Sequence, residues 1–422
     1  MNFLSVTIDK LKQKQNIFLT GGAGVGKTTL TRNIIEAFEE DAKKVAKLAS
    51  TGMAATLIGG QTLHSFLDLG IANNTQELEK NGKFEMKKKI KKLIGSMDLI
   101  VIDEISMVSA ALFEMIALRL AQAEYKGALL VVGDFLQLPP VVRGAKEVHF
   151  AFESQSWSEY DFETIELTHI YRTDDVRFIE LLHRVRFGVI DEQTHNHLNE
   201  YIKPLPEDLS EFTFLFGKNI SASYHNTQQL EHIENELFVK EAQVVKHSKN
   251  VKEYEIERFM EDARIEKELH LKVGAPVLFT RNAWNYFNGE RGVVVKVDAE
   301  YVYVEKKDGR VIKLEQVAQE KTLWKEVTRN GKKELSEESL FSVYQYPIKL
   351  AFAITIHKSQ GMSIEDLIIQ TNEIFAPSQF YVALSRTSNP KRLTLIAPQK
   401  QWYQLAFVHS KAMEFVRNGY RC

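Results

Sequence analysis

Short apolar runs alternate with stretches of helical spacing along the first third of the chain. The runs are rich in Val, Ile and Leu, end before glycine, hydroxyl or carboxyl residues, and cover residues 16–20, 44–49, 98–102 and 128–132. Continuous apolar runs of this length are typical of strands buried on both faces of a parallel sheet. Residues 29–38 and 109–123 carry apolar side chains at the spacing of amphipathic helices. The alternation predicts an α/β fold with a doubly wound parallel sheet, in which ligands bind where the strands end.

The second half of the chain shows a similar pattern, interrupted by a stretch of different character. A helix is predicted at 178–186, a long polar helical region at 227–266, and strands at 212–216, 366–370 and 393–396. Four short β-rich segments interrupt this pattern, at 275–280, 292–297, 301–304 and 311–314. Their Asn-Gly and Asp-Gly turns predict a small inserted barrel, and the charged residues 321–342 that follow predict a hairpin or loop.

These shifts of pattern divide the chain into segments. We expect a first domain from residues 1–67 and 96–165, a small inserted lobe at 68–95, a second domain from 166–265 and 343–422, and an inserted β domain at 266–342. The lobe contains a run of lysines between residues 87 and 92. This run is equally compatible with a solvated helix face and with a surface that contacts DNA.

Composition limits the class of protein further. With 422 residues the chain is too long for one ordinary core, and its net charge of −2 means that an anionic partner must bind in a local groove. The single cysteine, Cys422, excludes an internal disulfide framework and fits a reducing cytosol. No apolar stretch approaches 18 residues and no signal peptide is apparent, so we expect a cytoplasmic protein without a membrane span.

The most informative motif is the glycine-rich stretch at residues 21–28. It follows a predicted strand, precedes a predicted helix and matches the phosphate-loop pattern G-x-x-x-x-G-K-[ST]. The glycines allow backbone N–H groups to surround phosphate oxygens at a helix N-terminus. We therefore interpret it as a phosphate site rather than a plain strand–turn–helix, with Lys27 on the β/γ-phosphates and the Thr28 hydroxyl on Mg²⁺. The expected nucleotide-binding residues here are Gly22, Gly24, Val25, Gly26, Lys27, Thr28 and Thr29.

Two further strand ends carry polar residues that suit phosphate chemistry. Asp103 and Glu104 end the run at 98–102, where one carboxylate can complete a Mg²⁺ shell and its neighbour can polarise the attacking water. Gln137 follows the next strand, where it can lie beside the γ-phosphate. An ordinary strand-to-loop exit, stiffened by Pro139 and Pro140, is the alternative interpretation of that loop.

Taken together, these motifs resemble those of superfamily 1 DNA helicases. The motifs lie at residues 21–28, 50–55 with 61–66, 101–107 and 133–140. Their sequences are similar to those of the 5′-to-3′ branch, which contains the petite-integration-frequency (PIF), RecD-like and Dda-like helicases. Three segments in the second half also resemble family motifs, at 167–172, 355–362 and 381–386. Residues 271–274 and 288–293 resemble the PIF-type lead-in to an SH3-like barrel.

The resemblance implies a fold and a set of roles. The fold would consist of two RecA-like P-loop NTPase domains with a small insertion in each, the second insertion being an SH3-like β-barrel. Lys27, Thr28, Asp103, Glu104 and Gln137 would form the ATP site, with Gln360 and Gly361 against the nucleotide. Arg172 and Arg386 would be arginine fingers, and a surface ion pair is the alternative role for each. The single-stranded DNA track would be lined by Thr51, His64, Phe66, Thr355, His357 and Ser359, and the two histidines are also compatible with core positions.

We therefore predict an ATP- and Mg²⁺-dependent helicase, monomeric in solution, that moves 5′ to 3′ on single-stranded DNA and unwinds forked duplex in DNA replication, repair or recombination. The implied setting is bacterial or phage-type and nucleoid-associated. Binding to DNA should be sensitive to salt and tolerant of sequence, with Phe66 stacking on a base. Leu4 stands near the place of the family's adenine-reading Gln, so strict preference for ATP is not predicted. The alternative function is a DNA-stimulated ATPase that displaces bound protein with little unwinding; a binding module with a vestigial phosphate loop is disfavoured because the motif residues are intact.

Overall fold

The computed structural model describes residues 3–50, 54–55, 58–70, 72–141, 147–248, 251–263, 265–329 and 332–421. The chain divides into two compact units. The first unit comprises Met1–Tyr171, Leu323–Glu338 and His409–Cys422, and the second comprises Arg172–Thr322 and Ser339–Val408.

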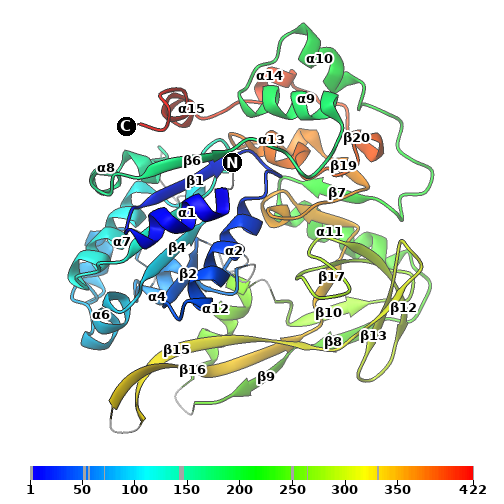
Figure 1. Ribbon diagram of the computed structural model, residues 1–422. Helices are drawn as coiled ribbons and strands as arrows, with labels where there is room; N and C mark the ends of the chain where they lie inside the picture. The colour runs from blue at the N-terminus through cyan, green and yellow to red at the C-terminus, as the bar shows by residue number, and fades with distance from the viewer. Residues whose placement is uncertain are drawn as a thin grey trace. The chain divides into compact units, whose positions relative to one another are not determined.

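A parallel sheet forms the centre of the first unit (Figure 1), and within the described residues it has six strands in the order β3-β2-β4-β5-β1-β6. Its strands are β1 (Ile17–Gly21), β2 (Val45–Ala49), β3 (Gln61–Thr62), β4 (Leu99–Asp103), β5 (Ala128–Val132) and β6 (Glu163–Leu167). Every residue of β1, β4 and β5 is buried. The prediction of a buried parallel sheet is thus confirmed, and its three central strands are those whose ends carry the phosphate-site motifs.

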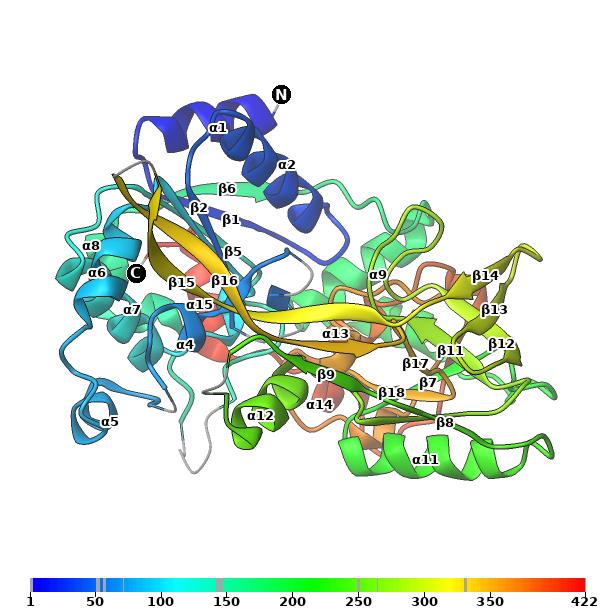
Figure 2. The ribbon, with the colours of Figure 1, turned by 90° about the horizontal axis from the view of Figure 1, so that it is seen from below.

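Helices cover both faces of this sheet (Figure 2). Helices α1 (Phe3–Lys12) and α2 (Lys27–Glu40) pack on one face, where Leu11 and Phe38 belong to the same hydrophobic core cluster as the strand residues Ile17 and Leu19. On the other face lie α7 (Ala110–Gln122), α8 (Gln155–Glu159) and α15 (Ser410–Arg417). Because successive strand residues point to opposite faces, Phe18 lies on that side, against Trp157, Phe135 and Phe415.

The inserted lobe contains two short helices, α5 (Thr75–Lys80) and α6 (Lys88–Gly95), after the single turn α4 (Leu63–Phe66). Arg119 of α7 anchors it. This side chain is 1% exposed, and its guanidinium donates hydrogen bonds to the carbonyls of Leu67 at 3.1 Å, Phe84 at 2.8 Å and Lys83. Asp68 forms ion pairs with Lys83 at 2.7 Å and Lys87 at 3.2 Å. At least one lysine of the run is therefore engaged within the lobe.

The second unit is built on a smaller parallel sheet, which in the described residues has four strands in the order β18-β7-β19-β20. These strands are β7 (Thr213–Phe216), β18 (Ala353–Thr355), β19 (Leu367–Ile369) and β20 (Leu393–Leu395). The helices of this unit are α9 (Val176–Arg186), α10 (Glu192–Asn199), α11 (Asn219–Glu231), α12 (Glu253–Ala263), α13 (Gln379–Leu384) and α14 (Trp402–Leu405). The strands predicted at 212–216, 366–370 and 393–396 are therefore confirmed as β7, β19 and β20.

An antiparallel sheet is inserted in the second unit, with the order β14-β13-β12-β11-β17 among the described residues. Its strands are β11 (Pro276–Phe279), β12 (Arg291–Val297), β13 (Val302–Lys306), β14 (Val311–Leu314) and β17 (Ile348–Leu350). The first four are the predicted β-rich segments. Gly289 has a φ of 88° in the turn before β12, a conformation that suits glycine.

Residues 227–266 differ from the prediction of one long helical region. The segment forms the end of α11, two strands, β8 (Phe238–Glu241) and β9 (Gln243–Lys246), and then α12. β8 pairs with β10 (Glu268–Leu271), and β9 pairs with β16 (Lys332–Gln345), which follows β15 (Val317–Arg329) as a hairpin (Figure 2). The strands were missed because their side chains are largely exposed and lack an apolar alternation.

The C-terminal segment also differs from the predicted domain division. Residues 343–422 were assigned to the second domain, yet 409–422 pack in the first unit, where Phe415 is 3% exposed. The periodicity of α15 indicates an apolar face but does not say which sheet that face covers. None of the helices in the described part of the chain has the length and apolar character required to cross a membrane.

Candidate nucleotide-binding site

The phosphate loop connects β1 to α2 in the first unit. Gly21, Gly24 and Gly26 have positive φ angles of 135°, 78° and 87°, and α2 begins directly at Lys27. The Lys27 ammonium donates to the carbonyl oxygens of Gly21 at 2.7 Å and Gly22 at 2.8 Å. A Cβ atom on Gly21 would lie 2.2 Å from the carbonyl oxygen of Leu167, so only glycine fits there.

Asp103 and Glu104 lie where β4 ends. Asp103 is 8% exposed, and its Oδ1 accepts a hydrogen bond from the Glu104 N–H at 2.8 Å. Burial raises the pKa of the Asp103 carboxyl, and this effect outweighs that N–H and the charges of Lys27 and Arg32. Glu104 adopts a left-handed conformation, with φ 55° and ψ 47°, which turns the chain sharply after the strand.

Gln137 lies in a tight turn after β5. Gly133 begins the exit with a φ of 156°, and the Asp134 carboxylate accepts from the Leu136 N–H at 3.1 Å and from Gln137 Nε2 at 3.4 Å. The Gln137 N–H donates to the Asp134 carbonyl at 2.9 Å. The turn is therefore held by its own hydrogen bonds.

Sheet order brings these three motifs to one edge. β4, β5 and β1 are neighbours, and their register pairs Ile102 with Val131 and Leu19 with Val132. Asp103, Gly133 and the phosphate loop thus follow adjacent ends of parallel strands, where ligands bind in open α/β sheets. The Thr28 hydroxyl, in the first turn of α2, and the Asp103 carboxylate are hard oxygen ligands of the kind that Mg²⁺ takes.

Tyr171 is a residue of this site that the sequence analysis did not single out. Its N–H donates to the Gly24 carbonyl at 2.8 Å, and its ring carbons lie 3.6 Å from the position of a Cβ on Gly26. The side chain is 72% exposed, with His169 in an edge contact at 4.5 Å. An exposed aromatic ring thus lies over the phosphate loop. The sequence signal that could have pointed to Tyr171 is its position directly before Arg172, a predicted arginine finger.

The second unit holds both predicted arginine fingers in one network. Arg172 is half-buried and donates through Nε to Ser363 Oγ at 2.9 Å and through Nη1 to the Ser385 carbonyl; burial lowers its pKa to about 10. Arg386 is 2% exposed and donates to the carbonyls of Val382 at 2.9 Å and Ser359 at 3.2 Å. Arg386 is therefore not the exposed side chain that a surface ion pair would require.

Gln360 and Gly361 follow the single turn at His357–Ser359, after β18. Gly361 has a φ of 76°. The Gln360 Nε2 atom is buried and, among the described residues, has no hydrogen-bond partner. A buried amide donor without a partner is costly, and such a donor suits a ligand that brings an acceptor.

The predicted DNA-contacting residues are less accessible than expected. Phe66 requires a correction: its side chain is 5% exposed because α4 turns it into the interior, so no ring face remains for a base. Thr355 and Ser359 are 2% and 0% exposed, and Ser359 Oγ donates to the Ile356 carbonyl at 2.8 Å, so neither side chain lines a surface in this conformation. His64 and His357 are half-buried, with His64 Nε2 3.2 Å from the Ala72 carbonyl oxygen. Thr51 lies outside the described residues.

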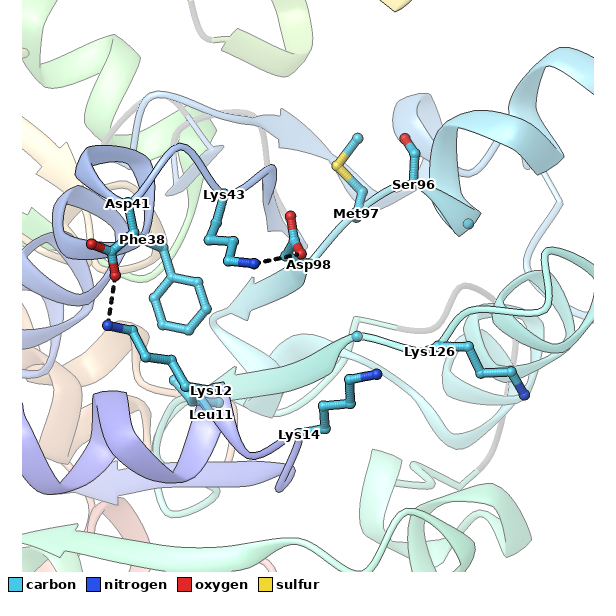
Figure 3. Close-up of a pocket in the computed structure, with 12 residues that line it drawn as sticks. Leu11, Lys12, Lys14, Phe38, Asp41, Lys43, Ser96, Met97, Asp98 and Lys126 are labelled. Atoms are coloured by element: carbon cyan, nitrogen blue, oxygen red, sulfur yellow. Dashed lines mark ion pairs between the residues drawn. The ribbon is translucent and has the colours of Figure 1, made fainter.

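A pocket of about 640 Å³ opens at the opposite edge of the first sheet (Figure 3). Its lining includes Lys14, Lys43 and Lys126, which precede the strands β1, β2 and β5. Ion pairs in this pocket join Lys12 to Asp41 at 2.6 Å and Lys43 to Asp98 at 3.6 Å. Because it lies where the strands begin, it has no part in the phosphate site.

The parallel sheet and the phosphate loop define a P-loop NTPase. A family model described as PIF1-like helicase matches residues 4–196, and ATP-dependent DNA helicase Pif1 of Campylobacter jejuni is 38% identical over 97% of this chain and 96% of its own length. The chain belongs to the PIF1-like helicase family.

Solved structures agree with this assignment. Pif1 of Bacteroides sp. in complex with ADP-AlF4 is 25% identical, has a TM-score of 0.81, and aligns over 99% of this chain and 96% of its own. Bacteroides Pif1 bound to ssDNA is 27% identical with a TM-score of 0.67 over the same shares. The first parallel sheet of this chain thus belongs to the RecA-like P-loop fold of these helicases.

Proposed function

We propose that this chain uses ATP hydrolysis to move 5′ to 3′ along single-stranded DNA and to unwind the duplex ahead of it. That it is an ATP-dependent DNA helicase follows from family membership, since a relative of matching length carries that name. The observation that carries the hydrolytic part is the convergence of Lys27, Asp103 and Gln137 at neighbouring strand ends. The polarity rests on the family resemblance of the motifs.

The phosphate loop binds the nucleotide in this proposal. Backbone N–H groups of residues 22–29, at the N-terminus of α2, surround the phosphates, and Lys27 moves from its loop carbonyls to the β/γ-phosphates. Gln360 supplies a donor on the second unit, next to Gly361. The exposed ring of Tyr171 offers a stacking face for the nucleotide base. Stacking on an aromatic ring discriminates little between bases, so it fits a site without an adenine-reading Gln.

Thr28 and Asp103 would hold Mg²⁺. The fit is supported by the buried Asp103 carboxyl, whose pKa is raised by burial and whose ionised form a divalent cation would stabilise. When bound, Mg²⁺ neutralises charge on the phosphate oxygens. Glu104 then polarises the attacking water, and Gln137 orients it and responds to loss of the γ-phosphate.

The two arginines take different parts in the proposal. Arg172 is half-buried, and two hydrogen bonds aim its guanidinium, so it is the better candidate for contact with the γ-phosphate. Arg386 is enclosed and donates to carbonyls of its own unit. To act as an arginine finger, Arg386 would have to exchange these hydrogen bonds for hydrogen bonds to the phosphate. Otherwise Arg386 acts by stabilising the loop that carries Gln360.

DNA binding is proposed along the predicted track, through backbone groups of residues 355–359 and through the side chains of His64 and His357, and Thr51 stays a predicted contact. Phosphate contacts would make affinity fall with salt, with little dependence on sequence. We also propose that the second sheet is a RecA-like domain, that the antiparallel insertion is an SH3-like barrel, and that the protein acts as a monomer.

One experiment separates this function from displacement of bound protein. ATP hydrolysis is measured with oligo-dT. Unwinding is measured on two duplexes that each have one single-stranded arm, a 5′ arm in the first and a 3′ arm in the second, and these are the two forks compared. A 5′-to-3′ helicase hydrolyses ATP and opens the fork that has the 5′ arm. Hydrolysis that leaves both forks closed supports the remodelling alternative, and opening only of the 3′-armed fork reverses the polarity.

The Lys27→Ala variant tests the site itself. It should abolish DNA-stimulated hydrolysis and leave oligo-dT affinity largely unchanged, because the lysine acts on phosphates of the nucleotide. Lys126→Ala, which changes an exposed lysine at the opposite edge of the sheet, is the matched control and should behave as wild type. Turnover by Lys27→Ala would refute the assigned phosphate site.

A further inference from the structure

The C-terminal helix α15 contributes an aromatic side chain to the core of the first unit. The Phe415 ring stacks on Phe152, with centroids 4.1 Å apart and planes at 3°, and meets the Phe135 ring edge-on at 5.4 Å and 89°. Such pairs prefer stacked or edge-to-face geometry, and each stabilises beyond its buried area. Phe415 therefore fixes the position of two rings.

Phe135 belongs to the turn that carries Gln137. Its side chain is 1% exposed and points into the aromatic cluster, while the Asp134 carboxylate holds the backbone of Leu136 and the amide of Gln137. The turn is thus short and rigid, so a shift of the Phe135 ring displaces Gln137 with it. Phe18 and Trp157 enclose the same ring at 5.4 and 5.7 Å.

Polar contacts fix both ends of the C-terminal segment on the same unit. At the start of α15, the Lys411 ammonium pairs with Glu153 at 2.7 Å and Glu147 at 2.9 Å. After the helix, the Tyr420 hydroxyl donates to Glu166 of β6 at 2.7 Å. The helix is therefore held in one position over the cluster.

We propose that Phe415 is a positioning residue for ATP hydrolysis, which acts through Phe135 on the Gln137 turn. This inference rests on the proposed function, in which Gln137 orients the attacking water. A small displacement of such a group affects the transition state more than the ground state. The C-terminal helix is then a working part of the hydrolytic unit, although it is the last element of the chain.

The test compares Phe415→Ala with a matched core variant. Phe113 is also a fully buried phenylalanine of this unit, and among the described residues its ring packs against Trp157, Tyr160 and Phe162 rather than Phe135. Both variants remove a phenyl ring from the interior, so both lower the melting temperature. Only Phe415→Ala should lower kcat for DNA-stimulated hydrolysis, by roughly ten- to a hundredfold.

Binding of nucleotide gives a second readout, which a loss of stability alone would not move. Phe415→Ala should keep KM for ATP and the Kd for ADP within about twofold of wild type, while its affinity for ADP-AlF4 falls together with kcat. Phe415→Leu, which retains an apolar side chain, should recover part of kcat. If Phe415→Ala does not fold, Phe415→Leu measured against Phe113→Leu carries the same comparison.

Gln137→Ala distinguishes failure of this inference from failure of the proposed function. If Gln137→Ala leaves kcat unchanged, the turn has no hydrolytic role and the proposed function of Gln137 is wrong. If Gln137→Ala loses kcat while Phe415→Ala keeps it, the positioning role is wrong. An equal loss of kcat in Phe415→Ala and Phe113→Ala also overturns it, because the effect is then general destabilisation.

Discussion

Arg172 and Arg386 donate hydrogen bonds to the same residue, Ser385. Arg172 reaches its carbonyl oxygen through Nη1, and Arg386 reaches its hydroxyl through Nη2 at 2.8 Å. Both also reach the loop after β18, where Arg172 binds Ser363 and Arg386 binds Ser359. Two arginines that lie far apart in the sequence thus stabilise one arrangement of two loops. The two side chains differ in exposure, and we therefore expect them to contribute differently to stability and to hydrolysis.

Substitution of Arg386 should destabilise the second unit as well as impair hydrolysis. Arg386→Ala removes hydrogen bonds from a charged donor, which contribute about 1.5–3 kcal/mol each, although the carbonyls of Val382 and Ser359 keep the Ser385 hydroxyl and the Met362 N–H as donors. Arg386→Lys should recover little, because an ammonium cannot reproduce the planar fork of donors. Urea denaturation monitored by circular dichroism gives the free energy of unfolding.

Arg172→Ala is the comparison for that prediction. Its side chain is half-buried, so its removal should cost less stability while abolishing DNA-stimulated hydrolysis. If the two alanine variants lose equal stability, the distinction between an enclosed and an accessible arginine does not hold.

Gly21→Ala should destabilise the first unit more than a Gly→Ala substitution at a position where the added Cβ has space. The added Cβ would meet the Leu167 carbonyl oxygen at 2.2 Å, and the φ of 135° adds conformational strain of about 1–3 kcal/mol. Gly82→Ala is the matched control, because Gly82 also has a positive φ, 64°, but a Cβ there meets no described atom within 4 Å. Thermal melts of both variants measure the difference, and equal melting temperatures would show that β6 yields to the methyl group.

The location of much of the candidate site was predictable from the sequence because its residues lie at strand ends. The apolar runs that end at Asp103 and before Gly133 mark buried parallel strands, and the parallel arrangement alone brings their ends together. The second sheet followed from the same pattern. These predictions needed only short-range information about strand, turn and helix.

What could not be predicted depends on contacts between residues distant in the chain. Phe415 packs on Phe135 across 280 positions, and no periodicity within α15 identifies that partner. The burial of Phe66 follows from the direction in which α4 turns, and a motif match does not determine that direction. Tyr171 was overlooked because its backbone contact with Gly24 is visible only in three dimensions.

Arg119→Met should loosen the inserted lobe. Methionine retains the apolar stem but leaves the carbonyls of Leu67, Lys83 and Phe84 without the guanidinium donor. Hydrogen exchange should therefore become faster in residues 67–84 than in the strands of the sheet. Lys91→Met is the control, since its ion pair with Glu124, at 3.0 Å, is on the surface and contributes little. Unchanged exchange in Arg119→Met would show that the lobe is held by other contacts.

Acidification should destabilise the protein, in part through His409. The ring of His409 meets Phe150 edge-on at 5.0 Å, and its Nδ1 atom is buried without a hydrogen-bond partner among the described residues. Burial lowers the pKa of this imidazole; nearby Lys411 and His149 lower it further, whereas Glu153 and Glu147 raise it. Burial also lowers the pKa of His197 and His225.

The sign of the effect follows from proton binding. A histidine whose pKa is lower in the folded state stays neutral there, whereas in the unfolded state it takes up a proton below its ordinary pKa of about 6.5. Stability should therefore be complete above that pH and fall as the pH drops towards the folded pKa. Urea denaturation at pH 7.5 and at pH 5.5 should show a smaller loss for His409→Gln than for wild type. The exposed His232, changed to Gln, is the control and should keep the wild-type loss; an identical pH dependence in all three proteins would mean that His409 is not a source of the acid sensitivity.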